Sequence, residues 1–357
     1  MTRYQQVRDE LRRAPRSWLV TGAAGFIGSA LVEELLSLGQ RVVGLDNLST
    51  GRARNVTEAV AAAGGSAGSF RLIEGDIRSP DDCAEACRGV DVVLHQAALG
   101  SVPRSIENPL ATHLNNVDGF LNMLVAVRDA GVGRMVYASS SSVYGDHPAL
   151  PKEEPAVGQP LSPYAASKAM NETYAGVFGR VYGTGTIGLR YFNVFGRRQS
   201  PDGPYAAVIP KWVGSLLAGE PCVINGDGET SRDFCYVDNV VQANLLAATV
   251  QDPEAVGRVY NVAGGERTTL NTLFRALRDG LARREPALAG AEPRYAGFRP
   301  GDVRHSLASI DRIRASLGYE PTHSVDAGLT AALDWYVADL RPAAGAAAAP
   351  HAGSVGS

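Results

Sequence analysis

A short apolar strand, a glycine-rich turn and a helix follow one another near the start of the chain, and this order strongly limits the possible folds. The strand covers 17–21, the turn reads Gly22-Ala23-Ala24-Gly25-Phe26-Ile27-Gly28, and the helix runs to about Leu38. Glycines allow a tight turn and let backbone N–H groups approach a pyrophosphate at a helix N-terminus. The spacing is G-x-x-G-x-x-G, so the strand–turn–helix context carries the interpretation. We predict a dinucleotide-binding unit with cofactor contacts at Gly22, Gly25, Phe26, Ile27 and Gly28.

Further strands are expected at 41–45, 70–74, 90–95, 134–138 and 186–190, with 259–262 rejoining them. Strands that alternate with helices form a parallel, doubly wound α/β sheet of Rossmann type. Asp46 follows the second strand, at about the distance from the glycines where an acid binds an adenine-ribose diol. Because an acid there repels a 2′-phosphate, we expect NAD rather than NADP, a preference that Arg52 and Arg54 weaken slightly.

Acidic and small residues follow the other strands. Asp76 comes after the third strand, where an acid can meet the adenine amino group, although a turn residue would look the same. Small residues after the fourth strand let the backbone approach a flat cofactor. The expected contacts at these strand ends are Asp46, Asn47, Asp76, Ile77, Gln96, Ala97 and Ala98.

Tyr164 and Lys168 stand four residues apart in a helical segment that runs to Tyr182. Ser162 suits the N-cap of this helix, and Pro163 suits its first position. Residues four apart share a helix face, so the lysine can lower the pKa of the phenol and make it a base. Taken alone, a Y-x-x-x-K pattern more often marks a tyrosine beside a solvated lysine on a helix face than a catalytic pair. Serines 139–142, which end the fifth strand, favour a site here, because ligands bind at the carboxyl ends of parallel strands.

The net charge of −3 gives no reason to expect nucleic-acid binding, and no apolar run is long enough to cross a membrane. The polar N-terminus does not resemble a secretory signal. Four cysteines occur without a C-x-x-C pair, so we expect buried thiols, no metal site and a reducing cytoplasm.

The chain divides into four expected parts. Residues 1–16 form an N-terminal helical extension, and 17–190 form the dinucleotide-binding Rossmann domain, with contributions from about 235–262. Residues 191–340 form a smaller, mixed α/β C-terminal domain for the substrate, and 341–357 form a disordered tail of alanine, glycine and proline. Long helices are expected at 109–130 and 162–182.

The ordered set of glycine turn, Asp46, serine cluster and Y-x-x-x-K resembles the extended short-chain dehydrogenase/reductase family, whose members act on nucleotide sugars. The resemblance runs from about Trp18 to Tyr336. Three segments (97–105, 190–199 and 225–234) are similar to bacterial UDP-N-acetylglucosamine 4-epimerases, which interconvert UDP-GlcNAc and UDP-GalNAc for surface polysaccharides.

This resemblance implies a reversible oxidation at the sugar C4. Tyr164 would take the 4-hydroxyl proton and NAD the hydride, giving a 4-keto sugar that turns over within the site. Lys168 would also hold the nicotinamide ribose, with Tyr191 near the cofactor, and the NAD should stay tightly bound. Ser140 would relay the proton, with Ser141 and Ser142 lining the site. Related 4,6-dehydratases and decarboxylases carry an extra acid at positions 141–143, where this chain has none.

The resemblance also implies how a UDP-sugar is held. Arg232 and Arg299 would clamp the diphosphate and Asp302 the uridine ribose, although surface ion pairs are the commoner role of a lone arginine. Ser306 is small where related enzymes for unsubstituted hexoses carry a tyrosine, which favours N-acetylated sugars. The remaining expected substrate contacts are Ser101, Val102, Arg104, Asn193, Val208, Lys211, Val223, Ile224 and Asn225.

Two other readings stay open. One is a 4-epimerase for a C6-oxidised sugar such as UDP-GlcNAcA or UDP-GlcA, for which Arg104 is a candidate cation. The other is a non-catalytic, NAD-binding regulator, although such proteins usually lose the tyrosine or the lysine. In either case we expect a homodimer formed through the helices at 109–130 and 162–182, as in the family.

Overall fold

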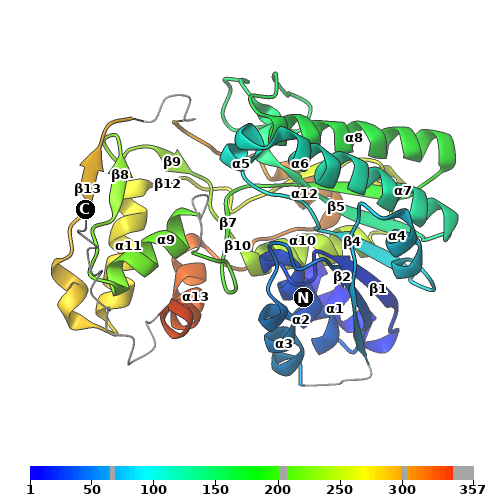
Figure 1. Cartoon of the computed structure of the whole chain (residues 1–357), viewed down its shortest axis with the longest axis horizontal. Helices are drawn as coiled ribbons and strands as arrows, with labels where there is room; N and C mark the ends of the chain where they lie inside the picture. Colours follow the sequence, from blue (N-terminus) through cyan, green and yellow to red (C-terminus); the bar gives the residue numbers. More distant parts are fainter. Residues whose placement is uncertain (65–68, 202–206, 299–303, 341–357) are drawn as a thin grey trace, which may run out of the picture.

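Seven parallel strands form the central sheet in the order β11-β6-β5-β4-β1-β2-β3, so the strand order reverses between β1 and β4 (Figure 1). The structure is a computed structural model that describes residues 1–64, 69–201, 207–298 and 304–340. Neighbouring strands are all parallel, so their carboxyl ends meet at one edge. The predicted doubly wound α/β fold is therefore confirmed. The strands of this sheet are β1 (Ser17–Thr21), β2 (Arg41–Asp46), β3 (Phe70–Glu74), β4 (Val92–His95), β5 (Arg134–Ser140), β6 (Thr186–Tyr191) and β11 (Val259–Val262).

Helices cover both faces of the sheet (Figure 1). One face carries α4 (Pro80–Ala86), α7 (Gly119–Asp129) and α8 (Pro163–Tyr182), and the other carries α2 (Phe26–Ser37) and α10 (Val237–Thr249). Successive strand residues point to opposite faces, and the two apolar cores divide accordingly. Leu19 and Met135 belong to the core under α4, α7 and α8, whereas Val20 and Val136 belong to the core under α2 and α10. Further helices are α3 (Ala53–Ala62), which packs on α2, and α12 (Asp311–Leu317), which packs on β11.

The N-terminal helix α1 (Arg3–Arg13) packs against α10, with Val7 and Leu11 buried. The buried Gln40 side chain anchors the end of this helix. Its Oε1 accepts from the backbone N–H of Arg16 (3.0 Å) and from the indole of Trp18 (3.1 Å), and its Nε2 donates to the carbonyls of Leu11 and Leu38 (2.9 Å each). One amide therefore ties α1, the end of α2 and the start of β1 together.

A smaller lobe follows β6 and lies to the left of the sheet in Figure 1. Its strands pair two by two: β7 with β10, β9 with β12, and β8 with β13. The helix α13 was not predicted from the sequence, although its buried Leu329, Leu333 and Tyr336 follow helical spacing. The elements of this lobe are β7 (Val194–Phe195), α9 (Val208–Leu217), β8 (Val223–Asn225), β9 (Ser231–Arg232), β10 (Cys235–Tyr236), β12 (Thr268–Thr269), α11 (Leu270–Ala282), β13 (Arg294–Ala296) and α13 (Val325–Leu340).

The helix expected over 109–130 is divided. It consists of α6 (Pro109–His113), a π-helical turn (Leu114–Asp118) and α7, preceded by the short α5 (Val102–Glu107). The buried Asn116 accounts for the local change. Its Oδ1 accepts from the N–H of Leu99 (2.7 Å), and its Nδ2 donates to the carbonyl of Leu99 (3.1 Å) and the hydroxyl of Ser167 (3.2 Å). Single π turns of this kind are frequent at functional sites.

Short 3-10 turns occupy Ser141–Tyr144, Pro253–Ala255 and Pro286–Gly290. Cys83 on α4 and Cys87 at its end are buried, as expected, and so are Cys222 and Cys235. None of the helices in the described residues is both long and apolar enough to span a membrane. The expected tail at 341–357 lies outside the described residues.

Candidate active site

The glycine turn closes tightly at the carboxyl edge of the sheet, beside the point where the strand order reverses. Gly22 has φ +67°, and a Cβ added there would lie 2.9 Å from the backbone N of Ala97. A Cβ on Gly28 would lie 2.0 Å from the Gly22 carbonyl oxygen. Gly25 is the N-cap of α2 and has no side chain to bond the first N–H groups of that helix. These N–H groups therefore face the cleft as donors for a diphosphate, which fits a dinucleotide.

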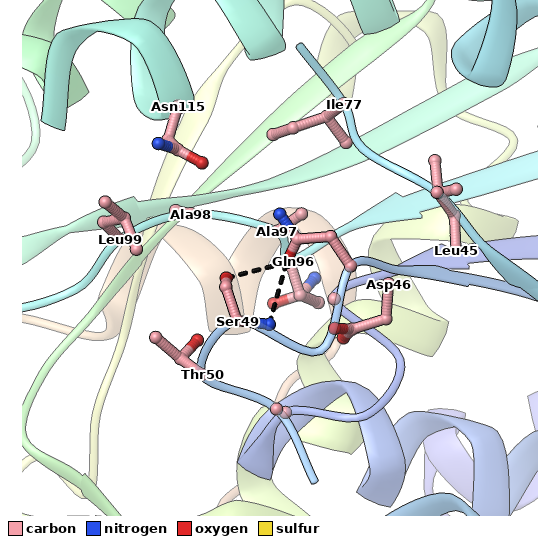
Figure 2. A pocket seen from close by; sticks show the side chains of 15 residues that line it. Leu45, Asp46, Ser49, Thr50, Ile77, Gln96, Ala97, Ala98, Leu99 and Asn115 are labelled. Carbon is pink, nitrogen blue, oxygen red and sulfur yellow. Dashed lines mark hydrogen bonds between the residues drawn. The ribbon is translucent and has the colours of Figure 1, made fainter. Parts of the chain in front are cut away.

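Two adjoining hollows form a cleft along this edge, with about 530 Å³ and 1190 Å³ of empty space. They share Gly22, Gly25, Thr50, Gln96 and Ala98 in their walls. Figure 2 shows the first hollow, with Asp46 at one side and Gln96, Ala97 and Ala98 across from it. Nearly all predicted cofactor contacts line one hollow or the other: Gly22, Gly25, Phe26, Ile27, Gly28, Asp46, Asn47, Ile77, Gln96, Ala97, Ala98, Tyr164, Lys168 and Tyr191.

Asp46 is held in place by backbone donors. Its Oδ2 accepts from the N–H of Ala24 (2.9 Å) in the glycine turn, and its Oδ1 accepts from the N–H of Leu48 (2.8 Å). Arg52 donates to Ser200 (2.8 Å) and Arg54 pairs with Asp339 (2.5 Å), so each guanidinium has a partner other than Asp46. The carboxylate thus remains the charge that faces the first hollow at the end of β2.

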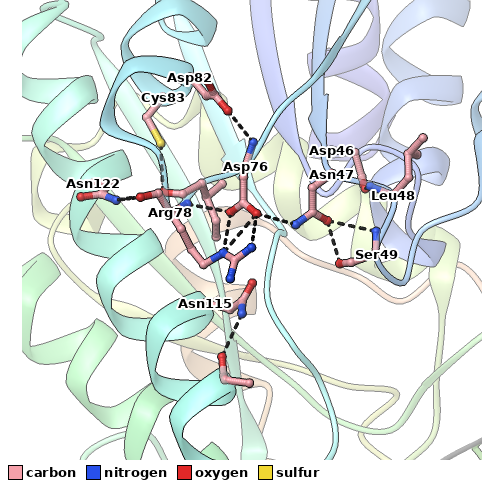
Figure 3. A network of polar contacts seen from close by, with 12 residues as sticks. Asp46, Asn47, Leu48, Ser49, Asp76, Arg78, Asp82, Cys83, Asn115 and Asn122 are labelled. Carbon is pink, nitrogen blue, oxygen red and sulfur yellow. Dashed lines mark hydrogen bonds and ion pairs between the residues drawn. The ribbon is translucent and has the colours of Figure 1, made fainter.

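Asp76 lies beside this hollow but is not among the residues that line it. Figure 3 shows its carboxylate between Asn47 and Arg78. Asn47 donates to Oδ2 (2.8 Å), and Arg78 donates to both oxygens (2.7–3.1 Å). The Arg78 hydrogen bonds lower the pKa of Asp76 to about 2, so the carboxylate stays ionised. Its direct interaction with an adenine stays a prediction, whereas its hold on Asn47 is a contact that the sequence did not reveal.

Tyr164, Lys168 and Ser140 meet in the second hollow, Tyr164 and Lys168 from α8 and Ser140 from the end of β5. Ser162 caps α8 through the N–H of Ala165 (3.1 Å), and Pro163 occupies the first turn, as predicted. Lys168 is 3% exposed, and its ammonium donates to the carbonyl of Ala138 (2.8 Å). That nitrogen lies 6.0 Å from the centre of the Tyr164 ring.

The pKa of Tyr164 differs from the sequence-based expectation. Burial raises it above the ordinary value for a phenol, and a hydrogen-bonding interaction with Ser140 lowers it in part. Burial also lowers the pKa of Lys168 to about 8, against an opposing effect of Glu172. Burial, which disfavours the charged form of each group, is therefore the largest effect on both pKa values.

The three serines that follow Ser139 do not share one position. Ser140 lines the cleft, whereas Ser141 and Ser142 belong to the 3-10 turn and are not among its lining residues. The hydroxyl and N–H of Ser142 both donate to the Ser140 hydroxyl (3.0 and 3.1 Å). Ser142 thus orients Ser140, and Ser141 lies one residue beyond the strand.

Tyr191 closes a ring of hydrogen bonds at the base of the second hollow. Its hydroxyl donates to Gln96 Oε1 (2.9 Å) and accepts from Asn244 Nδ2 (2.9 Å), and Gln96 Nε2 donates to Asn244 Oδ1 (3.2 Å). Asn244 comes from α10 and was not singled out from the sequence. Other lining residues that sequence reasoning missed lie mostly in loops: Ser49, Thr50, Gly51, Arg52, Asn55, Leu99, Asn115, Arg198, Gln199 and Ser200.

The expected substrate contacts are spread over both lobes. Asn193 lines the second hollow, with φ +28° and its Nδ2 donating to the carbonyl of Asp233 (3.1 Å). The N–H of Ser306 donates to the carbonyl of Ser231 on β9 (3.1 Å), so Ser306 lies beside Arg232. Ser101, Val102 and Arg104 lie at or in α5, Val208 and Lys211 lie in α9, and Val223, Ile224 and Asn225 form β8, where the Ile224 side chain is fully buried. Arg299 and Asp302 fall outside the described residues.

Asp233 organises the backbone next to Arg232. Its carboxylate accepts from the N–H groups of Gly264 (2.9 Å), Gly265 (3.2 Å) and Ala308 (3.1 Å). Burial raises its pKa to about 7 despite these bonds. No group of three or more His, Cys, Asp or Glu side chains suited to a metal occurs in the described part of the chain.

A doubly wound sheet whose cleft opens where the strand order reverses, with a Y-x-x-x-K helix on one wall, is typical of the extended short-chain dehydrogenases/reductases. The chain belongs to the NAD dependent epimerase/dehydratase family, whose family model matches residues 18–263. NAD is accordingly the cofactor of this chain. The helix α1 precedes the matched range.

Three similar proteins illustrate the range of activities within this family. The UDP-glucose 4-epimerase of Mycolicibacterium smegmatis is 37% identical over 320 residues, which cover 89% of this chain and 97% of that protein. A UDP-N-acetylglucosamine 4-epimerase from Methanobrevibacter ruminantium M1, solved with UDP-N-acetylmuramic acid, is 37% identical with a TM-score of 0.83 and covers 91% of this chain and 99% of its own. A UDP-glucuronic acid 4-epimerase from Bacillus cereus, solved with UDP-glucuronic acid and NAD, is 29% identical with a TM-score of 0.80 and coverage of 90% and 98%.

Proposed function

We propose that this protein is an NAD-dependent 4-epimerase of UDP-N-acetylhexosamines that interconverts UDP-GlcNAc and UDP-GalNAc and also accepts UDP-glucose and UDP-galactose. The observation that carries this choice of reaction is the chemistry of the second hollow. Its described lining residues include Tyr164, Lys168 and Ser140 but no aspartate or glutamate. Elimination of a sugar hydroxyl needs an additional acid or base beside the reacting carbon. Reversible oxidation at C4 needs only a proton acceptor and a hydride acceptor.

Each residue has a defined part in this proposal. When bound, NAD accepts the C4 hydride and returns it to the other face of the transient 4-keto sugar. Tyr164 takes the proton of the 4-hydroxyl, directly or through Ser140, and gives it back at the end. Ser142 orients Ser140, and the Lys168 ammonium favours the Tyr164 phenolate while the proton is away. Because the cofactor ends each cycle unchanged, it stays tightly bound.

Residues of the smaller lobe hold the UDP group in this proposal. Arg232, with Arg299, binds the diphosphate, and Asp302 binds the uridine ribose. Val208, Lys211 and β8 surround the uracil. Ser306 borders the sugar pocket beside Arg232 and leaves room for the acetamido group, and Ser101, Val102 and Arg104 form part of the same pocket wall.

The test is product analysis after incubation of the purified protein with a panel of UDP-sugars: UDP-GlcNAc, UDP-glucose, UDP-GlcNAcA and UDP-GlcA. We expect UDP-GalNAc from UDP-GlcNAc at the highest kcat/KM, with bound NAD released on denaturation. Faster turnover of an acidic sugar would instead assign Arg104 to its C6 carboxylate, as expected of an epimerase for C6-oxidised sugars. If the protein has bound NAD and an intact Tyr164 but converts none of these sugars, the remaining interpretation is a non-catalytic, NAD-binding regulator.

Ser306→Tyr tests the assignment of the sugar pocket. A tyrosine ring at this position fills the space proposed for the acetamido group, so UDP-GlcNAc turnover should fall more than tenfold while UDP-glucose turnover is retained. Ser306→Ala is the matched control and should retain both. Equal loss of both activities in a folded Ser306→Tyr protein would contradict the assignment.

We also propose a homodimer formed through α6 and α8, which pack on each other. Leu110 on α6 is 75% exposed and Leu114 in the π turn is 45% exposed, and Met170 and Tyr174 on α8 are 44% and 37% exposed. Pairing these two helices with their copies in a second chain would remove this apolar surface from water.

A further inference from the structure

A buried ion pair lies directly behind the Tyr164–Lys168 pair. Glu172 is one helical turn beyond Lys168 on α8, and it faces β5 and β6. Arg190, on β6, donates from Nε to Glu172 Oε1 (2.9 Å) and from Nη2 to Oε2 (2.8 Å). Both side chains are largely buried, with 4% of the Arg190 side chain and 15% of the Glu172 side chain exposed. Two parallel hydrogen bonds fix the carboxylate in one orientation.

The same carboxylate also holds the strand that carries Ser140. Ser139 donates its hydroxyl proton to Glu172 Oε1 (2.6 Å), and Lys168 bonds the carbonyl of Ala138 on the same strand. The end of β5 is therefore attached to α8 at two points, the Ala138 carbonyl and the Ser139 hydroxyl. A shift of Glu172 would move Ser139 and with it the neighbouring Ser140.

The charges that Lys168 meets come from three strands and its own helix. His95 on β4 is buried, and burial with the nearby lysine lowers its pKa to about 3, so it is neutral. Burial raises the pKa of Tyr137 on β5, which keeps that phenol neutral too. Tyr191 on β6 and Tyr164 on α8 are neutral for the same reason. Among the described residues packed behind Lys168, the charged groups are therefore Glu172 and its partner Arg190, while Arg52 and Arg198 line the open side of the same hollow.

Arg190 is fixed from its other side as well. Its Nη1 donates to the Glu154 carbonyl (3.0 Å), and its guanidinium lies 4.8 Å from the ring centre of Tyr144, whose pKa is raised by burial so that it too is neutral. The Glu154 carboxylate accepts from the N–H of Asn261 (2.9 Å) on β11, the edge strand next to β6. The position of Arg190 is thus set independently of Glu172.

We propose that Glu172 and Arg190 are positioning residues that set the charge of Lys168: the Glu172 carboxylate keeps the lysine protonated at neutral pH, and Arg190 limits how strongly it does so. This inference rests on the roles proposed above for Tyr164 and Lys168. An ammonium near Tyr164 favours the phenolate, so the charge on Lys168 decides how readily Tyr164 accepts a proton. The opposing effect of Glu172 on the lowered pKa of Lys168 agrees with this arrangement.

The sequence makes a direct test practical, because its only lysines are Lys152, Lys168 and Lys211. The NAD-loaded protein would be produced with lysine labelled with 13C at Cε, and each signal followed by NMR from pH 6 to 10. Lys152→Arg and Lys211→Arg variants assign the remaining signal to Lys168. The readout is the pKa of one side chain and does not depend on turnover of any sugar.

The two single variants should shift the pKa of Lys168 in opposite directions, and the double variant should restore it. Glu172→Gln keeps the shape but removes the negative charge, so Lys168 should lose its proton at least about tenfold more readily. Arg190→Gln leaves the carboxylate unopposed, so Lys168 should hold its proton at least about tenfold more tightly. The double variant has no net charge in the pair, like the wild type, and should return to within about threefold of it. Ser139→Ala is the control, because it removes one contact of Glu172 without changing any charge.

Removal of one charge from a buried pair is strongly destabilising, so a single variant can fail to fold. The double variant and the remaining single variant then still decide the sign of the effect. In the active enzyme, the alkaline limb of kcat/KM should move to lower pH in Glu172→Gln and to higher pH in Arg190→Gln. Titration curves of Lys168 that coincide in all folded variants would overturn the proposal, even if activity fell. An enzyme without epimerase activity but with the expected shifts would refute the proposed function and leave the charge relation intact.

Discussion

Replacement of Gln40 by alanine is expected to loosen the N-terminal helix without touching the cleft. The substitution removes all four hydrogen bonds of the amide. Three of the groups left behind belong to the buried residues Trp18, Leu11 and Leu38, and the fourth is the backbone N–H of the half-buried Arg16. A buried polar group that loses its partner costs about 1–3 kcal/mol. Three such groups give roughly 3–9 kcal/mol, and water entering the space left by the side chain favours the lower end, about 3 kcal/mol.

Thermal unfolding of the NAD-loaded protein, followed by calorimetry or circular dichroism, measures this loss. A decrease of about 3 kcal/mol corresponds to roughly 4 °C in Tm for a chain of this size, because the entropy of unfolding is about 2.1 cal/mol/K per residue. Gln40→Glu keeps an acceptor for Arg16 and Trp18 but buries a carboxylate beside the carbonyl oxygens of Leu11 and Leu38, so its Tm should fall at least as far as that of Gln40→Ala. Gln6→Ala, on the exposed side of α1, should change Tm by less than about 1 °C. If Gln40→Ala unfolded within 2 °C of the wild type, the three buried groups would have to find other partners, and the anchoring role of Gln40 would be wrong.

Three further predictions concern the site, its pH dependence and assembly. Tyr164→Phe should lower kcat about 10²–10⁴-fold with Tm unchanged, whereas Tyr182→Phe at the exposed end of α8 should leave kcat unchanged; a smaller loss would exclude Tyr164 as the base. The pKa of Asp233 is raised to about 7 in the folded protein, so its contribution to stability is present below the ordinary carboxyl pKa and is lost as pH rises from about 4 to 7. Denaturant titrations across this range should show the wild type losing roughly 4 kcal/mol relative to Asp233→Asn, and parallel pH curves would contradict the raised pKa. Leu110→Glu with Met170→Glu should convert the proposed dimer to a monomer in light scattering, and an unchanged dimer would move the interface elsewhere.

Local patterns in the sequence were sufficient to predict the sheet and most of the cofactor cleft. The glycine turn, the strand ends and the Y-x-x-x-K helix each depend on residues within about twenty positions of one another, and backbone geometry brings strand ends together. The family resemblance added the expected roles of Ser140 and Ser306. In these regions, residues that are close together in the sequence determine the local structure.

The contacts that the sequence did not reveal join distant segments. Asn244 reaches Gln96 across 148 positions, and Asn116 introduces a π turn by bonding Leu99 and Ser167. The predicted direction of the Tyr164 pKa shift was wrong, because burial depends on the packing of the whole site, which a four-residue spacing does not describe. Asp76 has the predicted place after β3, but Arg78, two residues later, occupies both of its oxygens. Which partner a polar side chain such as Asp76 bonds is decided by three-dimensional packing.

The docking of α1 on α10 also sets an order of events during synthesis. The helix is synthesised well before its packing partner, because the surface that buries Val7 and Leu11 is supplied by residues 237–249. At about 5–20 residues per second, the ribosome adds α10 roughly 10–50 s later. During that interval the apolar side of α1 remains uncovered and available to chaperones or to neighbouring nascent chains. The helix α1 therefore reaches its final place only after residues 237–249 have been made.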